Sequence, residues 1–475
     1  MAQFTLQKFT KTLVLSLVLA ALGFNAKAQN SKIKVYFNHQ PNNAVSSGTN
    51  PYYTQYFQDT VAKLINNAKY SVDIAQYDYT ASSGSLVAII ATACNNAAAR
   101  GVVVRWIADG NAPNSGLSLL SSGVQKLRSP TTGMVSGYIM HNKFVVIDAN
   151  STLATDAIIS TSSFDWSSSM ATSDYNNMVN IQDQPLAQAY DSQFNQMWGG
   201  SNPTPGASPK FSTNKTASPI NSFTVNGTPI QVYFSPTDGA SSQLNNLVNS
   251  ANNELYFGIY EFTTSNIANS MQAKYTSGVT GFGVMDQFST TGSNTPYLTL
   301  NQASILGPNR LKIYTGSAIY HNKMICADPN YPLSDPQVGC GSYNWTTTAS
   351  VTSDENFMVI HDATVANEYW QSLCADFHSL GGTACTVQLG IEKYDMGLQQ
   401  VAVYPNPFVD GVNINVKNAG ETLTVKITDQ LGKVVFEKTV NQTDEMKLNL
   451  NELSEGVYFV AVTSGNNHYT QKLIK

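Results

Sequence analysis

The chain has 475 residues and a formal net charge of −5, with 42% hydrophobic and 12% charged residues. It is too long for one ordinary hydrophobic core, so about three domains are expected. The composition excludes an intrinsically disordered chain, and the acidic balance argues mildly against a nucleic-acid binder, which concentrates Lys and Arg.

Residues 1–28 predict a secretory signal peptide. Lys8 and Lys11 precede an apolar run from Leu13 to Leu22, and Ala26-Lys27-Ala28 offers a cleavage site of small residues. The run is shorter than the roughly 20 apolar residues that a membrane helix needs. We therefore expect no stable membrane span. Cleavage would delete three lysines and no acids, which takes the net charge from −5 to −8.

Residues 29–200 predict a first α/β lobe. A short strand at 35–37 opens it, and further strands at 71–80 and 101–107 are separated by a helix. Strands that alternate with helices indicate a mixed, largely buried sheet flanked by helices. The lobe is expected to end in a helix whose core face carries large residues at helical spacing, namely Tyr190, Phe194 and Trp198.

The rest of the chain divides in the same manner. Residues 201–222 are rich in Pro, Gly, Ser, Thr and Asn and predict a surface linker. Residues 223–388 repeat the order of the first lobe and predict a second one, with Tyr369, Leu373 and Phe377 on its last helix. A linker at 389–400 precedes residues 401–475, where alternating strands at 412–416 and 423–427 indicate a small all-β sandwich. The wholly apolar residues 457–462 predict a central, fully buried strand.

Five cysteines are expected in an oxidising compartment, so at least one is unpaired. Cys374 and Cys385 are close enough in sequence to close a short loop. A cross-strand bridge between Cys326 and Cys340 is also plausible, and Cys94, in Ala-rich sequence, is expected to be a buried free thiol.

One polar pattern occurs twice. His141-Asn142-Lys143 is followed by Asp148, and His321-Asn322-Lys323, 180 residues downstream, is followed by Asp328. A single pattern of this kind would be weak evidence, but two in the same register are not chance. A repeat whose polar residues are its best-preserved part indicates one active site built from two similar halves.

The doubled motif suits displacement at phosphorus. One neutral imidazole can attack while the other protonates the departing oxygen, and Lys143 and Lys323 can stabilise the charge on the phosphate oxygens. No metal or cofactor is required. On a strand, His and Lys two residues apart share a face, whereas Asp148 and Asp328, five residues after the lysines, face the other way and are expected to be supporting residues.

These residues resemble the phospholipase D superfamily, whose signature is His-x-Lys, four residues, Asp, and then Gly-Ser-x-Asn. The second half matches with Gly341-Ser342-Tyr343-Asn344 and with Glu355 further on. The first half departs, since the aligned stretch is Ser162-Ser163-Phe164-Asp165 and Tyr175 is aligned with Glu355. The resemblance covers roughly residues 30–385.

The resemblance implies a role for each matching residue. His141 is expected to be the nucleophile that becomes a phosphohistidine, and His321 the acid and then the base. The substrate phosphate is expected to contact Lys143, Lys323, Ser163, Ser342 and Asn344. Glu355 would orient a histidine, Asp165 would disturb the symmetry of the phosphate site, and Asp174 is a candidate for the missing acid of the first lobe.

The C-terminal residues resemble the sorting domain of the type IX secretion system. The matching stretches are Val403-Tyr404-Pro405-Asn406-Pro407, Asp429-Gln430-Leu431-Gly432-Lys433, Leu453-Ser454-Glu455-Gly456-Val457-Tyr458 and the terminal Lys472-Leu473-Ile474-Lys475. The resemblance implies that the secretion machinery is a partner and that the protein reaches the exterior or the cell surface through the periplasm. A β-sandwich appended for adhesion is the alternative.

Three functions are consistent with the sequence. The first is a secreted phosphodiesterase of phospholipase D type that hydrolyses a phospholipid through a phosphohistidine. The second is an extracellular endonuclease with the same site, and the third is a non-catalytic surface or binding protein on this scaffold. Transferase chemistry at the same intermediate is also open. A monomer is expected in each case.

Overall fold

A computed structural model describes residues 30–291, 295–383, 385, 401–416, 422–429, 433–441, 445–464 and 467–475. The expected signal peptide therefore lies outside the described residues. The chain divides into two compact units, 1–386 and 387–475, and the first unit contains both lobes. Within the described residues no helix is both long and apolar enough to cross a bilayer.

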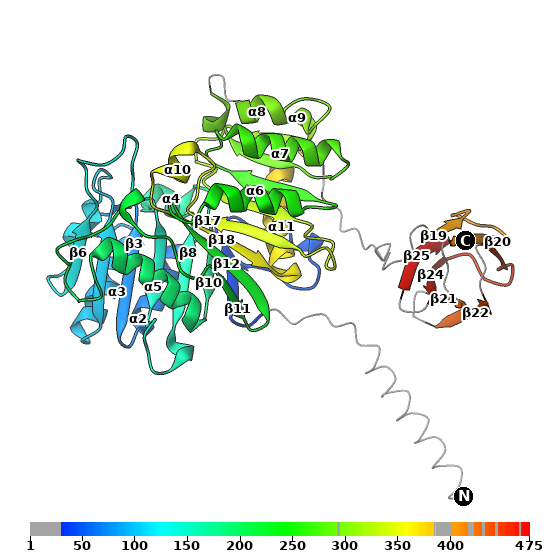
Figure 1. Ribbon diagram of the computed structural model, residues 1–475, viewed down its shortest axis with the longest axis horizontal. Coiled ribbons are helices and arrows are strands. Elements are labelled where there is room, and N and C mark those ends of the chain that lie inside the picture. Colours follow the sequence, from blue (N-terminus) through cyan, green and yellow to red (C-terminus); the bar gives the residue numbers. More distant parts are fainter. Residues whose placement is uncertain are drawn as a thin grey trace, which may run out of the picture. The chain divides into compact units, whose positions relative to one another are not determined.

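The first lobe is an eight-stranded mixed sheet covered by helices (Figure 1). Its strands follow the order β2-β1-β10-β8-β7-β3-β5-β6. The strands are β1 (Ile33–Phe37), β2 (Tyr52–Tyr53), β3 (Ser71–Gln76), β5 (Val103–Ala108), β6 (Val124–Arg128), β7 (Lys143–Ile147), β8 (Ile158–Ser162) and β10 (Asn177–Ile181), and β4 (Tyr79–Thr80) pairs separately with β9 (Trp166–Ser167). The helices are α2 (Phe57–Asn67), α3 (Ala88–Ala99), α4 (Ser168–Thr172) and α5 (Gln184–Trp198), with 3₁₀ turns at Asn43–Val45, Ser115–Leu119, Ala154–Asp156 and Ser212–Asn214.

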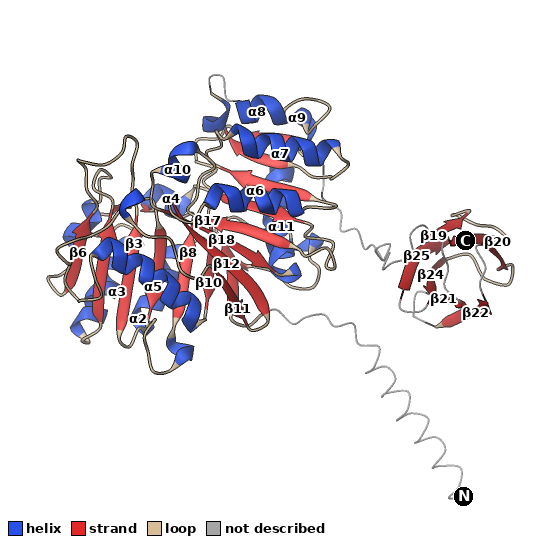
Figure 2. Ribbon diagram, in the orientation of Figure 1, coloured by secondary structure: helices blue, strands red, loops and turns tan. Residues whose placement is uncertain are grey.

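The second lobe repeats this plan. Its sheet has the order β11-β12-β18-β17-β16-β13-β14-β15, so β12 corresponds to β1, β18 to β10 and β16 to β7. The strands are β11 (Ser222–Val225), β12 (Thr228–Ser235), β13 (Leu255–Ile259), β14 (Gly283–Asp286), β15 (Leu311–Tyr314), β16 (Lys323–Ala327), β17 (Gln337–Gly341) and β18 (Glu355–His361). The helices are α6 (Ala240–Ser250), α7 (Ser265–Thr276), α8 (Thr295–Leu300), α9 (Gly307–Arg310), α10 (Thr347–Val351) and α11 (Ala363–Ser379), with a 3₁₀ turn at Gln287–Thr290. Figure 2 shows α6 and α7 lying along this sheet. The mixed α/β prediction is confirmed.

Helices α5 and α11 join the lobes. Tyr190 of α5 packs between Phe144 of its own sheet and Phe234 of the second lobe, with ring centroids 5.1 and 5.0 Å away. Tyr369 of α11 makes the reciprocal contact with Phe37 of the first lobe at 5.2 Å. The aromatic residues that the sequence places on the core face of these helices are therefore buried, and they fix one lobe against the other.

Most residues of the segment 201–222 are exposed, but Phe211 is buried and the Lys215 ammonium is 2.8 Å from the Asp354 carboxylate, so these two residues anchor the segment. One detail of the α/β unit differs from the sequence-based expectation. Cys374 and Cys385 form a disulfide, but Cys326 and Cys340 are free. The register explains this result, since Cys326 lies opposite Val338 and not opposite Cys340. Cys94 is a buried free thiol, as expected.

The C-terminal unit contains two antiparallel sheets around one core. One sheet has the order β19-β20-β23 and the other β22-β21-β24-β25. The strands are β19 (Val401–Tyr404), β20 (Gly411–Val416), β21 (Thr422–Asp429), β22 (Val434–Asn441), β23 (Glu445–Asn449), β24 (Val457–Ser464) and β25 (Asn467–Ile474). Apolar residues from both sheets share one cluster, which makes a small sandwich. Strand β24 is central but not fully buried, because its residues alternate between buried and half-buried.

Candidate active site

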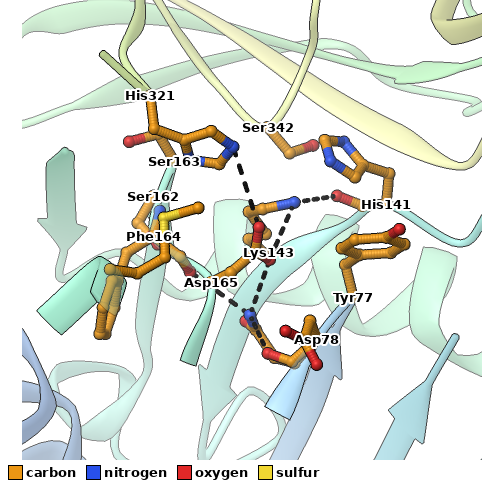
Figure 3. Close-up of polar contacts among 12 residues, drawn as sticks. Tyr77, Asp78, His141, Lys143, Ser162, Ser163, Phe164, Asp165, His321 and Ser342 are labelled. Atoms are coloured by element: carbon orange, nitrogen blue, oxygen red, sulfur yellow. Dashed lines mark hydrogen bonds and ion pairs between the residues drawn. The ribbon is translucent and has the colours of Figure 1, made fainter. Parts of the chain in front are cut away.

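The two His-x-Lys motifs meet where the lobes face each other. Each motif lysine is the first residue of a strand, β7 or β16, and each motif histidine lies two residues before that lysine. The backbone of the first motif pairs with the second lobe, since the His141 N–H donates to the Asp354 carbonyl (2.9 Å) and the Asp354 N–H to the Ile139 carbonyl (3.0 Å). The motif histidines and lysines are all buried, at 1–5% exposure. Figure 3 shows the rings of His141 and His321 on either side of Lys143.

A carboxylate of the second lobe holds the histidine of the first. Nδ1 of His141 is 2.8 Å from Oε1 of Glu355, the first residue of β18. The other carboxylate oxygen of Glu355 accepts a hydrogen bond of 2.6 Å from the Ser342 hydroxyl. A hydrogen bond at Nδ1 fixes the tautomer that leaves the Nε2 lone pair of His141 free for attack.

An amide of the first lobe holds the histidine of the second. Nδ1 of His321 is 3.2 Å from Oδ1 of Asn176, and this oxygen also accepts a hydrogen bond of 2.9 Å from the Ser163 hydroxyl. Asn176 is thus the structural equivalent of Glu355, whereas the sequence alignment placed Tyr175 there. Asp174, the candidate acid from the sequence, instead accepts a hydrogen bond from the Ile319 backbone N–H at 2.7 Å.

Ser163 and Ser342 were expected to contact the substrate, and the structure places their hydroxyls elsewhere. Besides bonding the orienting side chains, each hydroxyl accepts a 3.1 Å hydrogen bond from the backbone N–H of Asn177 or Asn356. Both serines are therefore positioned to support the residues that orient the histidines, rather than to bind phosphate directly.

The two lysines point their ammonium groups into the same pocket. Nζ of Lys143 and Nζ of Lys323 donate to the carbonyl of the histidine two residues before, at 3.2 and 2.9 Å. Each ammonium also lies over the face of a tyrosine ring, Tyr77 at 4.9 Å and Tyr260 at 5.1 Å from the centroid. These contacts leave further ammonium N–H groups for an anionic ligand, because an ammonium has three donors.

Asp165 occupies the middle of the pocket. Its carboxylate is 3.2 Å from Nζ of Lys143 and 3.9 Å from Nε2 of His321, as Figure 3 shows. The corresponding residue of the second lobe, Asn344, is buried, and its Oδ1 has no hydrogen-bond partner among the described residues. The first lobe thus presents a carboxylate where the second presents an amide.

Asp148 and Asp328 lie away from the pocket, at the far ends of the motif strands. The Asp148 carboxylate accepts hydrogen bonds from the backbone N–H groups of Lys69, Tyr70 and Ser71, at 2.7–2.8 Å. Asp328 does the same with residues 252–254, and both residues have a positive φ, 50° and 51°. They anchor the strand ends and do not reach the reacting groups.

Four further acids line the site or hold its backbone, and the sequence analysis did not single them out. Asp109 and Asp286 accept hydrogen bonds of 2.9 and 2.8 Å from the backbone N–H of the residue before each motif histidine, Met140 and Tyr320. Asp78 and Glu261 directly follow Tyr77 and Tyr260. Asp78 and Glu261 hold equivalent positions in the two matching segments, 73–80 and 256–263, and this equivalence could have identified both acids from the sequence.

Burial dominates the electrostatics of the pocket. It lowers the pKa of His141 and His321 well below the usual value, and both motif lysines add to this effect. Burial and the neighbouring Lys143 lower the pKa of Lys323 to about 7. The pKa values of Asp165 and Glu355 are raised by burial, against the opposing effect of the lysines. Both imidazoles are consequently neutral near neutral pH, as a nitrogen nucleophile must be.

These contacts bring two opposed imidazoles, two lysines and the carboxyl groups of Asp165 and Glu355 together in one buried cluster. A family model described as "Cardiolipin synthase, PLD-like domain" matches residues 61–198 and 244–376, more than half of the chain. The chain belongs to this PLD-like family, within the phospholipase D superfamily. A second model, a secretion system C-terminal sorting domain, matches residues 402–475. Both resemblances found in the sequence are thereby confirmed, and the PLD-like part of the chain carries a sorting domain behind it.

Solved structures and curated proteins resemble parts of this PLD-like chain. A phosphatidylserine synthase from Haemophilus influenzae has a TM-score of 0.50 and 13% identity, covering 72% of this chain and 86% of that one, which is a likeness of fold. The phospholipase D family member Nuc from Salmonella typhimurium is 25% identical with a TM-score of 0.27, covering 32% and 94%. An ulvan lyase from Nonlabens ulvanivorans is 36% identical over 78 residues, 16% of this chain. The chain spans only 14% of the length of that lyase.

Among the described residues, no group of three or more His, Cys, Asp or Glu side chains is arranged to hold a metal ion.

Proposed function

We propose that the protein is a secreted phosphodiesterase of phospholipase D type that hydrolyses a phospholipid through a phosphohistidine at His141. The observation that carries this assignment is the unequal pair of orienting residues, a carboxylate on His141 and an amide on His321. Attack on phosphorus makes the attacking imidazole positively charged. The carboxylate of Glu355 stabilises that charge, whereas the neutral amide of Asn176 does not.

The first step forms a nitrogen–phosphorus bond. Nε2 of His141 donates its lone pair to phosphorus, the bond from phosphorus to the head-group oxygen breaks, and His321 gives its proton to that oxygen. Lys143 and Lys323 neutralise the non-bridging oxygens. Because burial keeps His321 neutral without substrate, the negative charge of the bound phosphodiester must raise its pKa for it to carry this proton.

The second step returns the enzyme to its starting state. His321 takes a proton from water, the water oxygen bonds to phosphorus, and the electron pair of the nitrogen–phosphorus bond returns to His141. A primary alcohol in place of water gives transfer instead of hydrolysis by the same two proton movements.

Acidic groups around the pocket support a phospholipid over nucleic acid. Asp165 lies inside the pocket, and Asp78 and Glu261 stand beside the two tyrosines that flank the lysines. A polyanion would bring several phosphates toward these carboxylates, whereas a phospholipid brings one. Next to His321, a cavity of about 460 Å³ is lined by Tyr260, Phe288 and Asp286 among others, and such an aromatic and acidic wall suits a cationic head group.

The sorting domain supports an extracellular location, since its family directs secretion. The type IX secretion machinery is accordingly the proposed partner of residues 402–475, and a monomer is the proposed working form of the enzyme.

The test offers the purified protein phosphatidylcholine vesicles and, separately, supercoiled DNA, each with a chelator present. The expected result is choline release that is lost in His141→Ala, with a phosphatidyl adduct on the peptide containing His141 after rapid quenching in denaturant at neutral pH, because acid cleaves the nitrogen–phosphorus bond. Nicking of DNA without choline release would replace the proposal by the endonuclease alternative, which the Gly341-Ser342-Tyr343-Asn344 segment also allows. Absence of both activities would leave the non-catalytic binding protein.

A further inference from the structure

A second recess lies in the first lobe, between strands β1 and β10 and helix α2. It is a cavity of about 260 Å³, and its lining contains Lys32, Lys34 and Lys63 but no Asp or Glu. Lys32 and Lys34 are two residues apart at the start of the lobe, so their side chains point to the same face of the sheet. Lys63 approaches that face from α2.

The rest of the lining is an ordered mixture of polar and apolar groups. On α2 the contributors are spaced to share one side of the helix, and on β10 Asn180 is the register partner of Lys34. The polar members are Ser31, Thr60, Asn67, Asn180 and Gln182, and the apolar members are Tyr36, Leu64 and Ile158. The recess therefore offers ammonium groups and neutral hydrogen-bonding groups around an apolar floor.

No carboxylate neutralises this charge. None of the three lysines forms an ion pair with an Asp or Glu among the residues that the structure describes. The chain as a whole has 31 acids against 26 Lys and Arg. The recess therefore carries a local positive charge, whereas the chain as a whole is acidic.

The second lobe has the same recess without the charge. A cavity of about 240 Å³ lies at the equivalent place, lined by Gln231, Gln243, Asn246, Leu247, Ser250, Gln337, Val359 and His361. Gln231 of β12 stands where β1 has Lys34, and Asn246 of α6 stands where α2 has Lys63. The fold forms this recess in both lobes, but only the recess of the first lobe is lined by lysines. The fold alone therefore does not require the lysines.

We propose that the recess of the first lobe is a second ligand site, which binds a small organic phosphate whose organic part lies against Tyr36, Leu64 and Ile158. Its volume is near the lower limit of about 300 Å³ for small-molecule pockets, which suits a compact phosphate ester and not a bulky ligand. Lysine ammonium groups bind phosphate as point charges, and no lining carboxylate opposes the anion.

The recess is distinct from the catalytic pocket. Asn177, next to the orienting Asn176, is the first residue of β10, whereas Asn180 near its end and Gln182 just beyond it line the recess. At about 3.3 Å per residue, these two residues are roughly 10 and 16 Å from Asn177 along the strand. The proposal therefore does not depend on the function assigned to the histidines.

The test measures binding of phenyl phosphate and of inorganic phosphate to the full chain by calorimetry at low salt. The variant Lys34→Gln with Lys63→Asn gives the first lobe the residues of the second at the same positions. We expect its Kd for phenyl phosphate to be at least about tenfold higher than that of the wild type, because two charged hydrogen-bond donors are lost. The matched control, Gln231→Ala with Asn246→Ala, should bind as the wild type does, and the reverse variant, Gln231→Lys with Asn246→Lys, should gain a site.

The readout is the difference in Kd between the wild type and the variant. Phosphate that binds in the catalytic pocket contributes equally to both proteins, so it does not affect this difference. An unchanged melting temperature shows that the exposed substitutions leave the fold intact. Equal Kd values for the wild type and the Lys34→Gln, Lys63→Asn variant would overturn the site. Inorganic phosphate bound as tightly as phenyl phosphate would overturn the apolar contact, and binding of an oligonucleotide but not of phenyl phosphate would replace the proposal by a nucleic-acid contact.

Discussion

The Glu355 carboxylate of the second lobe is hydrogen-bonded to the His141 ring of the first at 2.8 Å, across the boundary between the lobes. At the symmetry-related place, Asn176 holds His321 at 3.2 Å. Two rings with the same sequence motif are thus chemically unequal, because one faces an acid and the other an amide. The carboxylate of Asp165 lies near both motifs, 3.2 Å from Nζ of Lys143 and 3.9 Å from Nε2 of His321.

Glu355→Gln should lower kcat strongly while the protein stays folded. The amide keeps the shape of the side chain but removes the charge that stabilises the cationic imidazole, and it can stabilise the wrong tautomer of His141. By analogy with other carboxylate–histidine pairs we expect a fall of about 10²-fold or more. Choline release at saturating lipid measures kcat. An unchanged kcat would show that His141 is not the nucleophile.

Asn176→Asp should shift the basic limb of the pH profile upward. A carboxylate beside His321 favours its protonated form and raises its pKa, which burial holds well below the usual value. The acid form of His321 then persists to higher pH. The measurement is the pH dependence of kcat/KM, and Asn176→Gln is the control without charge. A shift of the limb to lower pH would contradict the role of His321 as the acid.

Asp165→Asn should tighten phosphate binding. In the wild type the ionised carboxylate competes with the substrate for Lys143, and the raised pKa of Asp165 reduces this competition only at lower pH. Removal of one negative charge near the phosphate is expected to lower the inhibition constant of inorganic phosphate about tenfold. The comparison is made at about pH 7, where Lys323, with its pKa of about 7, keeps part of its charge and Asp165 is more ionised than at lower pH. Equal constants would mean that Asp165 turns away when phosphate binds.

The KM of the wild type should rise as the pH passes through about 7, because Lys323 loses its proton there. Lys323→Arg keeps the positive charge throughout this range, since arginine stays protonated. We expect the rise in KM to disappear in this variant even if its KM is higher overall. The slope of log KM against pH is the readout, and equal slopes for the two proteins would contradict titration of Lys323.

Asp148→Ala should destabilise the fold without touching the catalytic groups. It leaves three backbone N–H groups without their buried acceptor, at a cost of about 3–5 kcal/mol in the free energy of unfolding. Asp148→Asn keeps one acceptor oxygen and tolerates the positive φ of 50°, so it should cost less. All five tryptophans lie in residues 1–386, so their fluorescence during urea unfolding reports on this unit. Equal stability of the Ala variant and the wild type would contradict the anchoring role.

The sequence predicted the motifs well because their residues are local. The His-x-Lys pairs, the two lobes and the aromatic faces of α5 and α11 follow from short spacings and from the repeat. The partner of each histidine was out of reach, because it depends on how one lobe docks on the other. The sequence assigned Glu355 to a histidine without saying which, and only the packing of β18 against the first motif decides for His141.

The alignment of the two halves paired Tyr175 instead of Asn176 with Glu355 for a simple reason. The histidines are 180 residues apart, but the Ser163 and Ser342 turns are 179 apart, so the alignment slips by one residue between them. Trp166 and Trp345 are also 179 residues apart, and the same offset of 179 pairs Asn176 with Glu355. Tyr175 and Asp174 lie in the segment before β10 and make other contacts, Tyr175 with the ring of His39 and Asp174 with the Ile319 backbone N–H.

The covalent connection of the two lobes has an evolutionary consequence. A pocket assembled from two identical subunits would present the same orienting side chain to both rings, and any substitution would appear twice. With both halves in one polypeptide, Glu355 and Asn176 were free to diverge. A repeated fold within one polypeptide can therefore give each imidazole its own orienting residue and its own half of the catalytic cycle.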